Sequence, residues 1–410
     1  MPTPAPPADA VSPSAPERRA VQIPVYMDNM ATTPVDPRVL ADMLPYFGTH
    51  FGNASSKTHA FGLAAADAVE KAREEVAGLI GARAQEIVFT AGATEANNLA
   101  IKGAVQMVPP GAHIITCATE HKAVLECCHT LEQQGVEVTY LSVDRSGQID
   151  LDQLAAAITP RTALISLMAA NNEIGVLQPL AAIGRLARER GVLWHCDAAQ
   201  AVGKVPLDVE ALGIDLLSAS GHKLYAPKGV GFLYVRSRKP RVRLQAQVEG
   251  GGQERGLRGG TLNVPGIVGL GRACQLGREE MTEEAARLVQ MRRRLCAGLE
   301  AALGSLIVNG HAEDRLPGNL NVSFLGVDGT ELLLGLREIA LSSGAACSSR
   351  TSAPSHVLKA VGVNDDWARA SLRFGLGRFN TMAEVEFAID RTVAQVERLR
   401  DGALAIEERI

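Results

Sequence analysis

Short apolar segments alternate with helical segments over more than half of this sequence, and that alternation limits the folds open to the chain. Between Leu63 and Ile80 the apolar side chains recur with the 3.6-residue period of a helix. Segments that are apolar throughout, such as Val192–Cys196, are typical of parallel strands buried on both faces. The others are Glu86–Thr90, His113–Cys117, Leu164–Met168, Leu216–Ser220 and Val230–Val235. The pattern predicts an α/β architecture in which helices cover a mainly parallel sheet.

We expect a tail and two domains. Residues 1–22 are rich in Pro, Ala and Ser and lack the apolar core of a secretory signal, which predicts a disordered N-terminal tail. Residues 23–265 are predicted to form the large domain, with the first of them packing against the smaller one. Residues 266–410 are predicted to form that smaller α+β domain, with an amphipathic helix from about Thr282 to Leu303. Its other predicted elements are strands at Asn319–Phe324 and Ala370–Phe374 and helices at Thr330–Ile339 and from about Thr381.

Charge and cysteine content argue against several classes of protein. Lys and Arg number 41 and Asp and Glu 45, a balance without the basic surface that nucleic acids or anionic membranes attract. No segment approaches the ~20 continuous apolar residues of a membrane helix. The seven cysteines are odd in number and contain no Cys-x-x-Cys pair, which argues against a disulfide framework and a zinc site. We therefore expect a cytoplasmic protein without a structural metal.

Two polar residues follow predicted strands where an α/β fold binds its ligands. Asp197 comes directly after Val192–Cys196, and Lys223 stands in a glycine-bearing loop after Leu216–Ser220. A lysine in such a loop, taken alone, is more often simply solvated. Pyridoxal phosphate, however, needs a lysine for its Schiff base and an acid that keeps its ring nitrogen protonated. Two neighbouring strand ends that offer both fit that demand.

A phosphate site is predicted at Thr90–Glu95, where a strand ends, small residues turn and a helix begins. Backbone N–H groups, the helix dipole and the Thr94 hydroxyl would all favour a dianion there. An ordinary N-cap by Thr94 is the common alternative. His121 also stands between an apolar strand and a helix, so its imidazole could stack on a cofactor ring or merely cap the helix.

Nine short segments, in order and at sensible spacing, give the chain a wider resemblance. They are Met27–Pro34, Phe51–Asn53, Gly92–Glu95, Thr119–Val124, Asn171–Gly175, Asp197–Gln200, Ser220–Lys223, Glu254–Gly256 with Gly260–Thr261, and Arg373–Phe374 with Gly377–Phe379. From Val25 to about Arg400 the chain resembles the cysteine desulfurases of the NifS/IscS type, which are class V aminotransferase-like, fold-type I pyridoxal-phosphate enzymes. The resemblance implies a seven-stranded, mainly parallel sheet and a homodimer with shared active sites.

The resemblance also implies how the cofactor ring is held. Lys223 would form the internal aldimine with pyridoxal 5'-phosphate, and Asp197 would pair with the ring nitrogen. Gln200 would hydrogen-bond the ring hydroxyl. His121 would stack on the ring and help to move protons, and Asn172 would contact the cofactor from the substrate side.

The phosphate and the substrate are assigned by the same resemblance. The phosphate would be held by small or hydrogen-bonding residues of one subunit, namely Ala93, Thr94, Ser220 and His222. Thr261 would reach the phosphate bound in the other subunit. Asn172 and Arg373 would bind the carboxylate of the substrate L-cysteine, the arginine through its two-pronged guanidinium.

Cys347 separates the desulfurases from other enzymes of this fold. It lies in Leu341–Ser355, a stretch of small and polar residues that predicts an exposed mobile loop. The other six cysteines stand in or beside apolar segments. The resemblance implies that the Cys347 thiolate takes the sulfur, leaving a persulfide and alanine, and passes it to a sulfur acceptor or an iron–sulfur scaffold protein. The same thiolate could transiently ligate a nascent iron–sulfur cluster.

Two alternatives stay open on the sequence. The first is another enzyme on the same fold, a selenocysteine lyase or a small-molecule aminotransferase, although transamination needs no nucleophilic thiol. The second is an idle subunit of this fold that acts as a binding protein, against which the presence of Lys223, Asp197 and Cys347 speaks. The chain also departs from the family at Ala345–Ser348 and at Ala353. The acceptor therefore stays open among nitrogenase assembly, general iron–sulfur assembly and tRNA thiolation.

Overall fold

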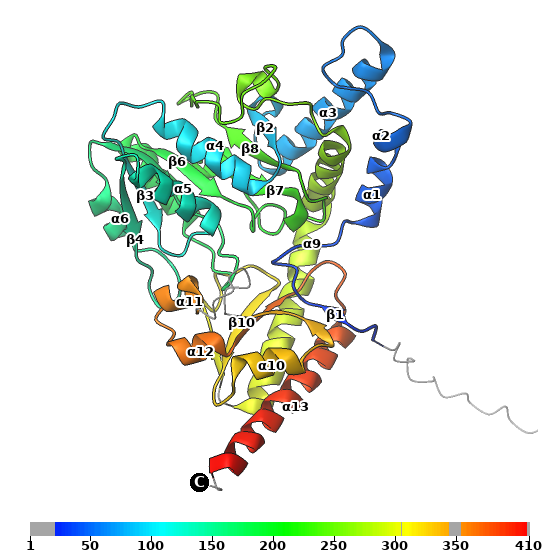
Figure 1. The fold of residues 1–410 in the computed structure, drawn as a ribbon, viewed down its shortest axis with the longest axis vertical. Coiled ribbons are helices and arrows are strands. Elements are labelled where there is room, and N and C mark those ends of the chain that lie inside the picture. Colours follow the sequence, from blue (N-terminus) through cyan, green and yellow to red (C-terminus); the bar gives the residue numbers. More distant parts are fainter. Residues whose placement is uncertain (1–20, 305, 344–353, 408–410) are drawn as a thin grey trace, which may run out of the picture.

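The computed structural model describes residues 21–304, 306–343 and 354–407. A large body that contains most of the chain sits above a smaller one, and a single helix, α9 (Val264–Leu303), runs along both (Figure 1).

The large body is built on a seven-stranded sheet in the order β2-β8-β7-β6-β5-β3-β4. Its strands are β2 (Ile87–Thr90), β3 (His113–Cys117), β4 (Glu137–Leu141), β5 (Thr162–Ser166), β6 (Leu193–Asp197), β7 (Leu216–Ser220) and β8 (Gly231–Val235). All run in one direction except β8, which is antiparallel to both of its neighbours. The mainly parallel seven-stranded sheet predicted from the sequence is confirmed.

Two strands differ from what the apolar pattern indicates. The pattern of Val230–Val235 predicts a parallel strand, but the connection from Ser220 to Gly231 is too short for the crossover that a parallel strand needs, so β8 turns back. The pattern of β4 predicts no strand at all. It lies at the sheet edge, where Glu137 and Tyr140 are exposed, so the strand contains polar residues instead of being apolar throughout.

Helices cover both faces of the sheet, which explains why its central strands are apolar at successive positions. In β5, Leu164 packs among residues of α4 (Ala93–Val105) and α5 (Lys122–Glu132), whereas the adjacent Ile165 packs on the opposite face. That opposite face is covered by α3 (Ala60–Leu79), α7 (Leu180–Arg190) and the first half of α9. The remaining helices of this body are α1 (Pro37–Met43), α2 (Pro45–Gly48), α6 (Leu151–Ala157) and α8 (Val209–Leu212).

The smaller body has an antiparallel sheet in the order β12-β13-β10-β9. Its strands are β9 (Leu306–Val308), β10 (Asn319–Phe324), β12 (Ser342–Ser343) and β13 (Ser371–Gly375), and its helices are α10 (Gly329–Gly335), α11 (His356–Ala360), α12 (Asp365–Arg369) and α13 (Met382–Glu407). The N-terminal strand β1 (Val25–Tyr26) pairs in parallel with β11 (Ile339–Ala340) of this body. The second hydrophobic core lies between this sheet, α13 and the end of α9.

Helix α9 is longer than the sequence pattern indicates. The pattern predicts a helix from about Thr282, but the helix begins at Val264 and has 40 residues. Its first half contains glycines that disfavour a helix when considered alone. They allow close packing instead: a Cβ on Gly271 would lie 2.6 Å from the Cα of Ala72 in α3. The division of the chain at residue 265 stays a prediction.

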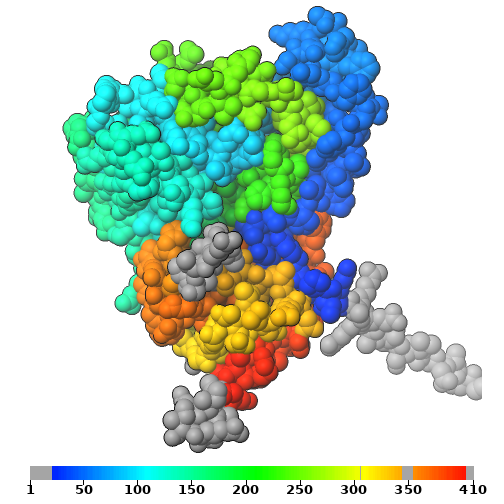
Figure 2. Space-filling model, viewed as in Figure 1, coloured from blue at the N-terminus to red at the C-terminus, as the bar shows by residue number. Residues whose placement is uncertain are grey.

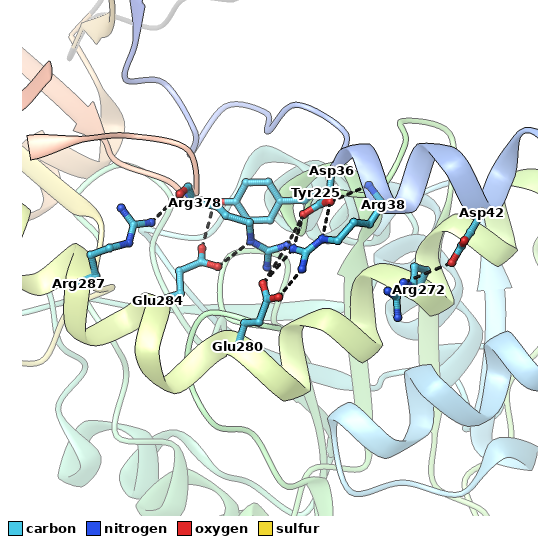
Figure 3. Close-up of polar contacts among 9 residues, drawn as sticks. All are labelled: Asp36, Arg38, Asp42, Tyr225, Arg272, Glu280, Glu284, Arg287 and Arg378. Carbon is cyan, nitrogen blue, oxygen red and sulfur yellow. Dashed lines mark hydrogen bonds and ion pairs between the residues drawn. The ribbon is translucent and has the colours of Figure 1, made fainter. Parts of the chain in front are cut away.

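A network of ion pairs joins the N-terminal segment, α9 and the smaller body (Figure 3). Arg378 binds the Asp36 carboxylate at 2.8 Å and the Glu284 carboxylate of α9 at 2.8 Å, while its guanidinium lies over the Tyr225 ring. Arg38 binds Asp36 from the other side, and the two arginines hold the pKa of Asp36 well below its usual range. The network fixes the position of the smaller body against the large sheet.

Candidate active site

A cavity of about 890 Å³ lies where the carboxyl ends of β2, β3, β5, β6 and β7 meet the smaller body. The structure brings most of the predicted site residues together in its wall, namely Ala93, Thr94, His121, Asn172, Asp197, Gln200, Ser220, His222, Lys223 and Arg373. Thr261 is not part of the wall and is exposed to solvent. Cys347 lies outside the described residues.

Lys223 projects into the cavity from the turn after β7. Its Nζ donates hydrogen bonds to the carbonyl oxygens of Met30 and Ala31, each at 2.7 Å. Burial and, to a smaller extent, the charge of Arg373 lower the pKa of Lys223 to about 8. A fraction of the amine is therefore neutral near neutral pH, the form in which a lysine acts as a nucleophile.

Asp197 ends β6 and is only 6% exposed. One carboxylate oxygen accepts a hydrogen bond from Asn97 Nδ2 at 2.7 Å, and the other from the Ala199 amide at 3.0 Å. Among the described residues, no lysine or arginine forms an ion pair with it. Asn97 was not among the predicted site residues, although an asparagine on the otherwise apolar face of a predicted helix was a usable signal, and the structure buries it fully.

The start of α4 forms a cradle for an anion. Gly92 caps the helix with a φ of 153°, a backbone conformation that favours glycine, and its Cα lies against β8: a Cβ on Gly231 would come within 2.7 Å of it. The hydroxyls of Thr94 and Ser220 line the same end of the cavity. Among the described residues no side chain caps this helix start, although the Ala91 amide before it donates to Glu95 Oε2 at 3.0 Å. The first backbone N–H groups of α4 therefore suit a phosphate.

His222 and His121 are both held neutral. Burial and the nearby charge of Lys223 lower the pKa of His222 to about 4, and its Nδ1 lies 3.1 Å from the Thr32 hydroxyl. His121 caps α5, with its Nδ1 accepting from the Ala123 amide at 3.1 Å. Its ring is open to the cavity, yet partial burial still lowers its pKa. Because Nδ1 accepts, the proton is on Nε2. The capping contact thus leaves the ring face and Nε2 available.

Arg373 enters from β13 and is 8% exposed. Its guanidinium donates to the Asn172 carbonyl at 2.9 Å and to Asp28 Oδ1 and Ser342 Oγ, each at 2.8 Å. Its Nε is buried without a partner among the described residues. Asp28 and Ser342, which orient this arginine, were not predicted as site residues.

Both ends of the segment 344–353 are attached beside the cavity. On one side, Ser342 belongs to the Arg373 cluster. On the other, the Ser355 hydroxyl binds the Glu173 carboxylate, and His356 Nε2 lies 3.1 Å from the Glu120 carbonyl oxygen. The chain therefore leaves and re-enters the described structure at the mouth of the same site.

Comparison with known proteins agrees with this geometry. The Aminotransferase class-V family matches residues 25–387. The chain belongs to this family. It is 58% identical over 382 residues to the cysteine desulfurase IscS of Anaeromyxobacter dehalogenans (strain 2CP-C), which covers 93% of this chain and 94% of that protein. The resemblance expected from the nine sequence segments is confirmed.

Solved structures agree in fold. A NifS-like protein superposes with a TM-score of 0.85 at 38% identity and covers 92% of this chain and all of its own. A structure described as SspA in complex with cysteine gives a TM-score of 0.78 at 39% identity and covers 87% of this chain and 100% of its own.

Enzymes of this family use pyridoxal phosphate, and the cofactor predicted from the sequence is thereby confirmed. The cavity fits the group at three points. Lys223 offers an amine of lowered pKa, and the glycine-capped start of α4 offers N–H donors. The buried Asp197 has no cationic partner among the described residues, and a protonated ring nitrogen would supply one. Each helix in the described part of the chain is too short or too polar to cross a membrane. In the same residues no group of three or more His, Cys, Asp and Glu side chains is arranged to hold a metal ion.

Proposed function

We propose that the chain is a cysteine desulfurase, which converts L-cysteine to L-alanine and transfers the sulfur to Cys347 as a persulfide. The observation that carries the proposal is one cavity that combines a lysine of lowered pKa, an arginine, and a buried carboxylate that has no cationic partner among the described residues. The names of the relatives support the choice of cysteine as the substrate. The test is to supply L-cysteine and a reductant, with alanine and sulfide expected in equal amounts. A keto acid formed in their place would make the chain an aminotransferase.

When bound, pyridoxal phosphate supplies an electron sink that allows bonds at the amino acid to be broken. Asp197 would keep the proton on the ring nitrogen, because a buried carboxylate stabilises the positive charge beside it. Gln200 would donate to the ring hydroxyl. Thr94, Ser220, His222 and the N–H groups at the start of α4, which begins at Ala93, would hold the phosphate.

The remaining residues act on the substrate. Arg373 and Asn172 bind its carboxylate and so fix which bond faces the reacting groups. Lys223 would be the base that moves the proton of the substrate α-carbon, and His121, with its proton on Nε2, would be a proton donor. The Cys347 thiolate would then accept the sulfur and become a persulfide.

The other thiols support the assignment of Cys347 by their chemistry. Five of the six described cysteines are buried, and Cys296 is half-buried. Burial raises the pKa of Cys117, Cys127 and Cys296 to about 11 and that of Cys128 to about 12. It raises the pKa of Cys196 and Cys274 further above the ordinary value. None of these six is a thiolate at neutral pH.

We also propose a homodimer with shared sites. Large apolar side chains are exposed on α2, at the start of α3 and between them, with Phe47 65% and Phe51 66% exposed. This region stands out at one corner of the molecule (Figure 2), and a surface of this kind is typical of an interface. Thr261 is exposed and absent from the cavity wall of its own subunit, as expected for a residue that completes the site of a second copy.

Dilution should separate the cofactor from the protein. We expect a dimer by light scattering, and cofactor retention that falls as dimers dissociate, because binding and assembly are coupled. Thr261→Ala should weaken retention by about fivefold, the effect of one lost hydrogen bond, without changing the dissociation of the cofactor-free dimer. Thr282→Ala, at an exposed position on α9, is the control. A monomer that holds the cofactor at full occupancy would contradict the shared site.

The rate of cofactor capture should depend on pH through Lys223. Only the neutral amine adds to the aldehyde, so the rate at which the cofactor-free protein acquires the visible band should rise with pH up to about 8 and level off above it. Below that value the rate should fall about tenfold per pH unit, since the neutral fraction does. Stopped-flow absorbance measures it. A rate that is constant across this range would mean that another group limits capture.

We place the enzyme in the cytoplasm and propose that Cys347 delivers its sulfur to an acceptor protein for the assembly of iron–sulfur clusters or of another sulfur-containing product, which includes thiolated tRNA. Affinity capture under conditions that preserve persulfides, followed by mass spectrometry of the bound proteins, identifies that acceptor. If the only recipients recovered are small thiols, delivery to a protein is wrong.

A further inference from the structure

A second lysine lies behind the wall of the cavity. Lys204 stands four residues after Gln200, in the turn that follows β6, and its Nζ donates to Gln200 Oε1 at 3.0 Å. It does not line the large cavity. It borders a separate cavity of about 20 Å³, whose wall also includes Met30, Tyr225 and Glu284. No predicted motif included Lys204.

The surroundings of Lys204 direct its charge at Gln200. Among the described residues, no carboxylate forms an ion pair with it. Glu284 is the nearest acidic influence, but its two oxygens already accept from Tyr225 Oη at 3.2 Å and from Arg378 Nε at 2.8 Å (Figure 3). The Met30 sulfur, at 3.9 Å, is only a weak acceptor. The side-chain oxygen of Gln200, Oε1, is therefore the principal partner of the Lys204 ammonium.

This contact determines which way the Gln200 amide points. An ammonium has three donors and no acceptor, so only Oε1 can face Lys204. Nε2 then donates to the Met30 carbonyl at 2.9 Å, the same oxygen that accepts from Lys223 at 2.7 Å. Gln200 lines the large cavity, and its NH₂ group carries a second hydrogen. That hydrogen is left for an acceptor inside the cavity.

We propose that Lys204 is a positioning residue of the cofactor site, which keeps the N–H of Gln200 directed at the oxygen on the pyridine ring. The inference rests on the proposed role of Gln200. Without the ammonium, the Gln200 amide loses the partner that holds Oε1 in place. If the amide then turned over, Oε1 would face the Met30 carbonyl oxygen or the ring oxygen, and two acceptors would meet. Lys204 thus acts through Gln200 and does not itself touch the cofactor.

The charge of Lys204 should itself depend on pH. Burial and the positive charge of Lys223 lower the pKa of Lys204 to about 7. The other charged or titratable groups that influence it are Glu284, Arg373 and His222. Since a lysine is charged below its pKa, the advantage of the wild type over an uncharged variant should be complete below about 7 and shrink above it.

A double-mutant cycle on cofactor affinity tests the inference without relying on turnover. We expect Lys204→Met to raise the pyridoxal-phosphate dissociation constant about tenfold, as for the loss of a hydrogen bond to a charged group. In a Gln200→Met background the same change should have no further effect. Lys204→Arg keeps the charge and the donor, so it should restore affinity to within about threefold of the wild type. Lys71→Met, at an exposed position on α3, is the matched control.

The cycle can overturn the inference in three ways. The two losses could add, Lys204→Met could bind the cofactor like the wild type, or Gln200→Met could have no effect while Lys204→Met does. If circular dichroism shows that Lys204→Met is unfolded, Lys204→Gln takes its place in the cycle. Alanine production from cysteine by the wild type is measured separately, so failure of the proposed activity is distinguishable from failure of this inference.

Discussion

Replacing Lys223 with Ala is expected to abolish the visible band of the bound cofactor and to lower alanine production by roughly 10²–10⁴-fold or more, the range for losing a positioned acid–base group. The change removes both the amine that holds the cofactor covalently and the base that acts on the substrate. The fold should survive, because the side chain makes two hydrogen bonds within the described part of the chain, both to carbonyl oxygens of one turn. Absorbance and amino-acid analysis measure the two losses.

Lys223→Arg is the matched control for charge, because arginine keeps the positive charge but is always protonated and cannot attack an aldehyde. It should be as inactive as the alanine variant. Borohydride reduction of the wild type, followed by peptide mapping, should place the cofactor on Lys223. Finding it on Lys228, which also lines the cavity, would overturn the assignment.

Cys347→Ser should separate cofactor chemistry from sulfur transfer. Serine is nearly the same size, but its hydroxyl stays protonated without an adjacent base. The variant should keep the cofactor band and still change its spectrum on addition of cysteine, while alanine production falls roughly 100-fold or more. Mass spectrometry of the wild type after exposure to cysteine should find one added sulfur atom on the peptide that contains Cys347.

Cys296→Ser is the matched control for this prediction. Cys296 is the half-buried thiol among those described, and burial together with Glu300 raises its pKa to about 11. The Cys296→Ser variant should therefore produce alanine at the wild-type rate. If Cys347→Ser desulfurates cysteine at the wild-type rate, Cys347 is an ordinary surface thiol, and a lyase or transaminase becomes the better interpretation.

The parts of the fold that could be predicted are those whose residues carry a local pattern. β3 and β7 coincide with their apolar segments, because strands buried on both faces have no reason to alternate. The direction of β8 depends on the length of a connection, and β4 on its place at the edge. The length of a connection and a place at the sheet edge are not properties of the strand's own residues. The apolar pattern therefore could not predict the direction of β8 or the presence of β4.

The candidate site shows the same limit. Lys223 and Asp197 could be recognised because each follows a strand and because the cofactor demands both. Asn97 and Lys204 act through contacts across the chain or across a turn, and neither stands in a position that a motif marks. Asp28 belongs to the segment Met27–Pro34, but its contact with Arg373 joins residues 345 positions apart and leaves no local pattern. The structure of a single subunit cannot assign Thr261 to a site, because Thr261 is exposed and does not line the cavity of its own chain.

Helix α9 has a consequence for how this chain could have diversified. Its 40 residues span about 60 Å and contribute to both hydrophobic cores. No cut can separate the two bodies without severing one continuous helix, so neither can be exchanged between relatives as an independent module. The two cores should also melt in a single transition, since a helix that loses one core loses much of what keeps it folded in the other. The two bodies are therefore expected to be inherited together, as the match of the relatives across both of them indicates.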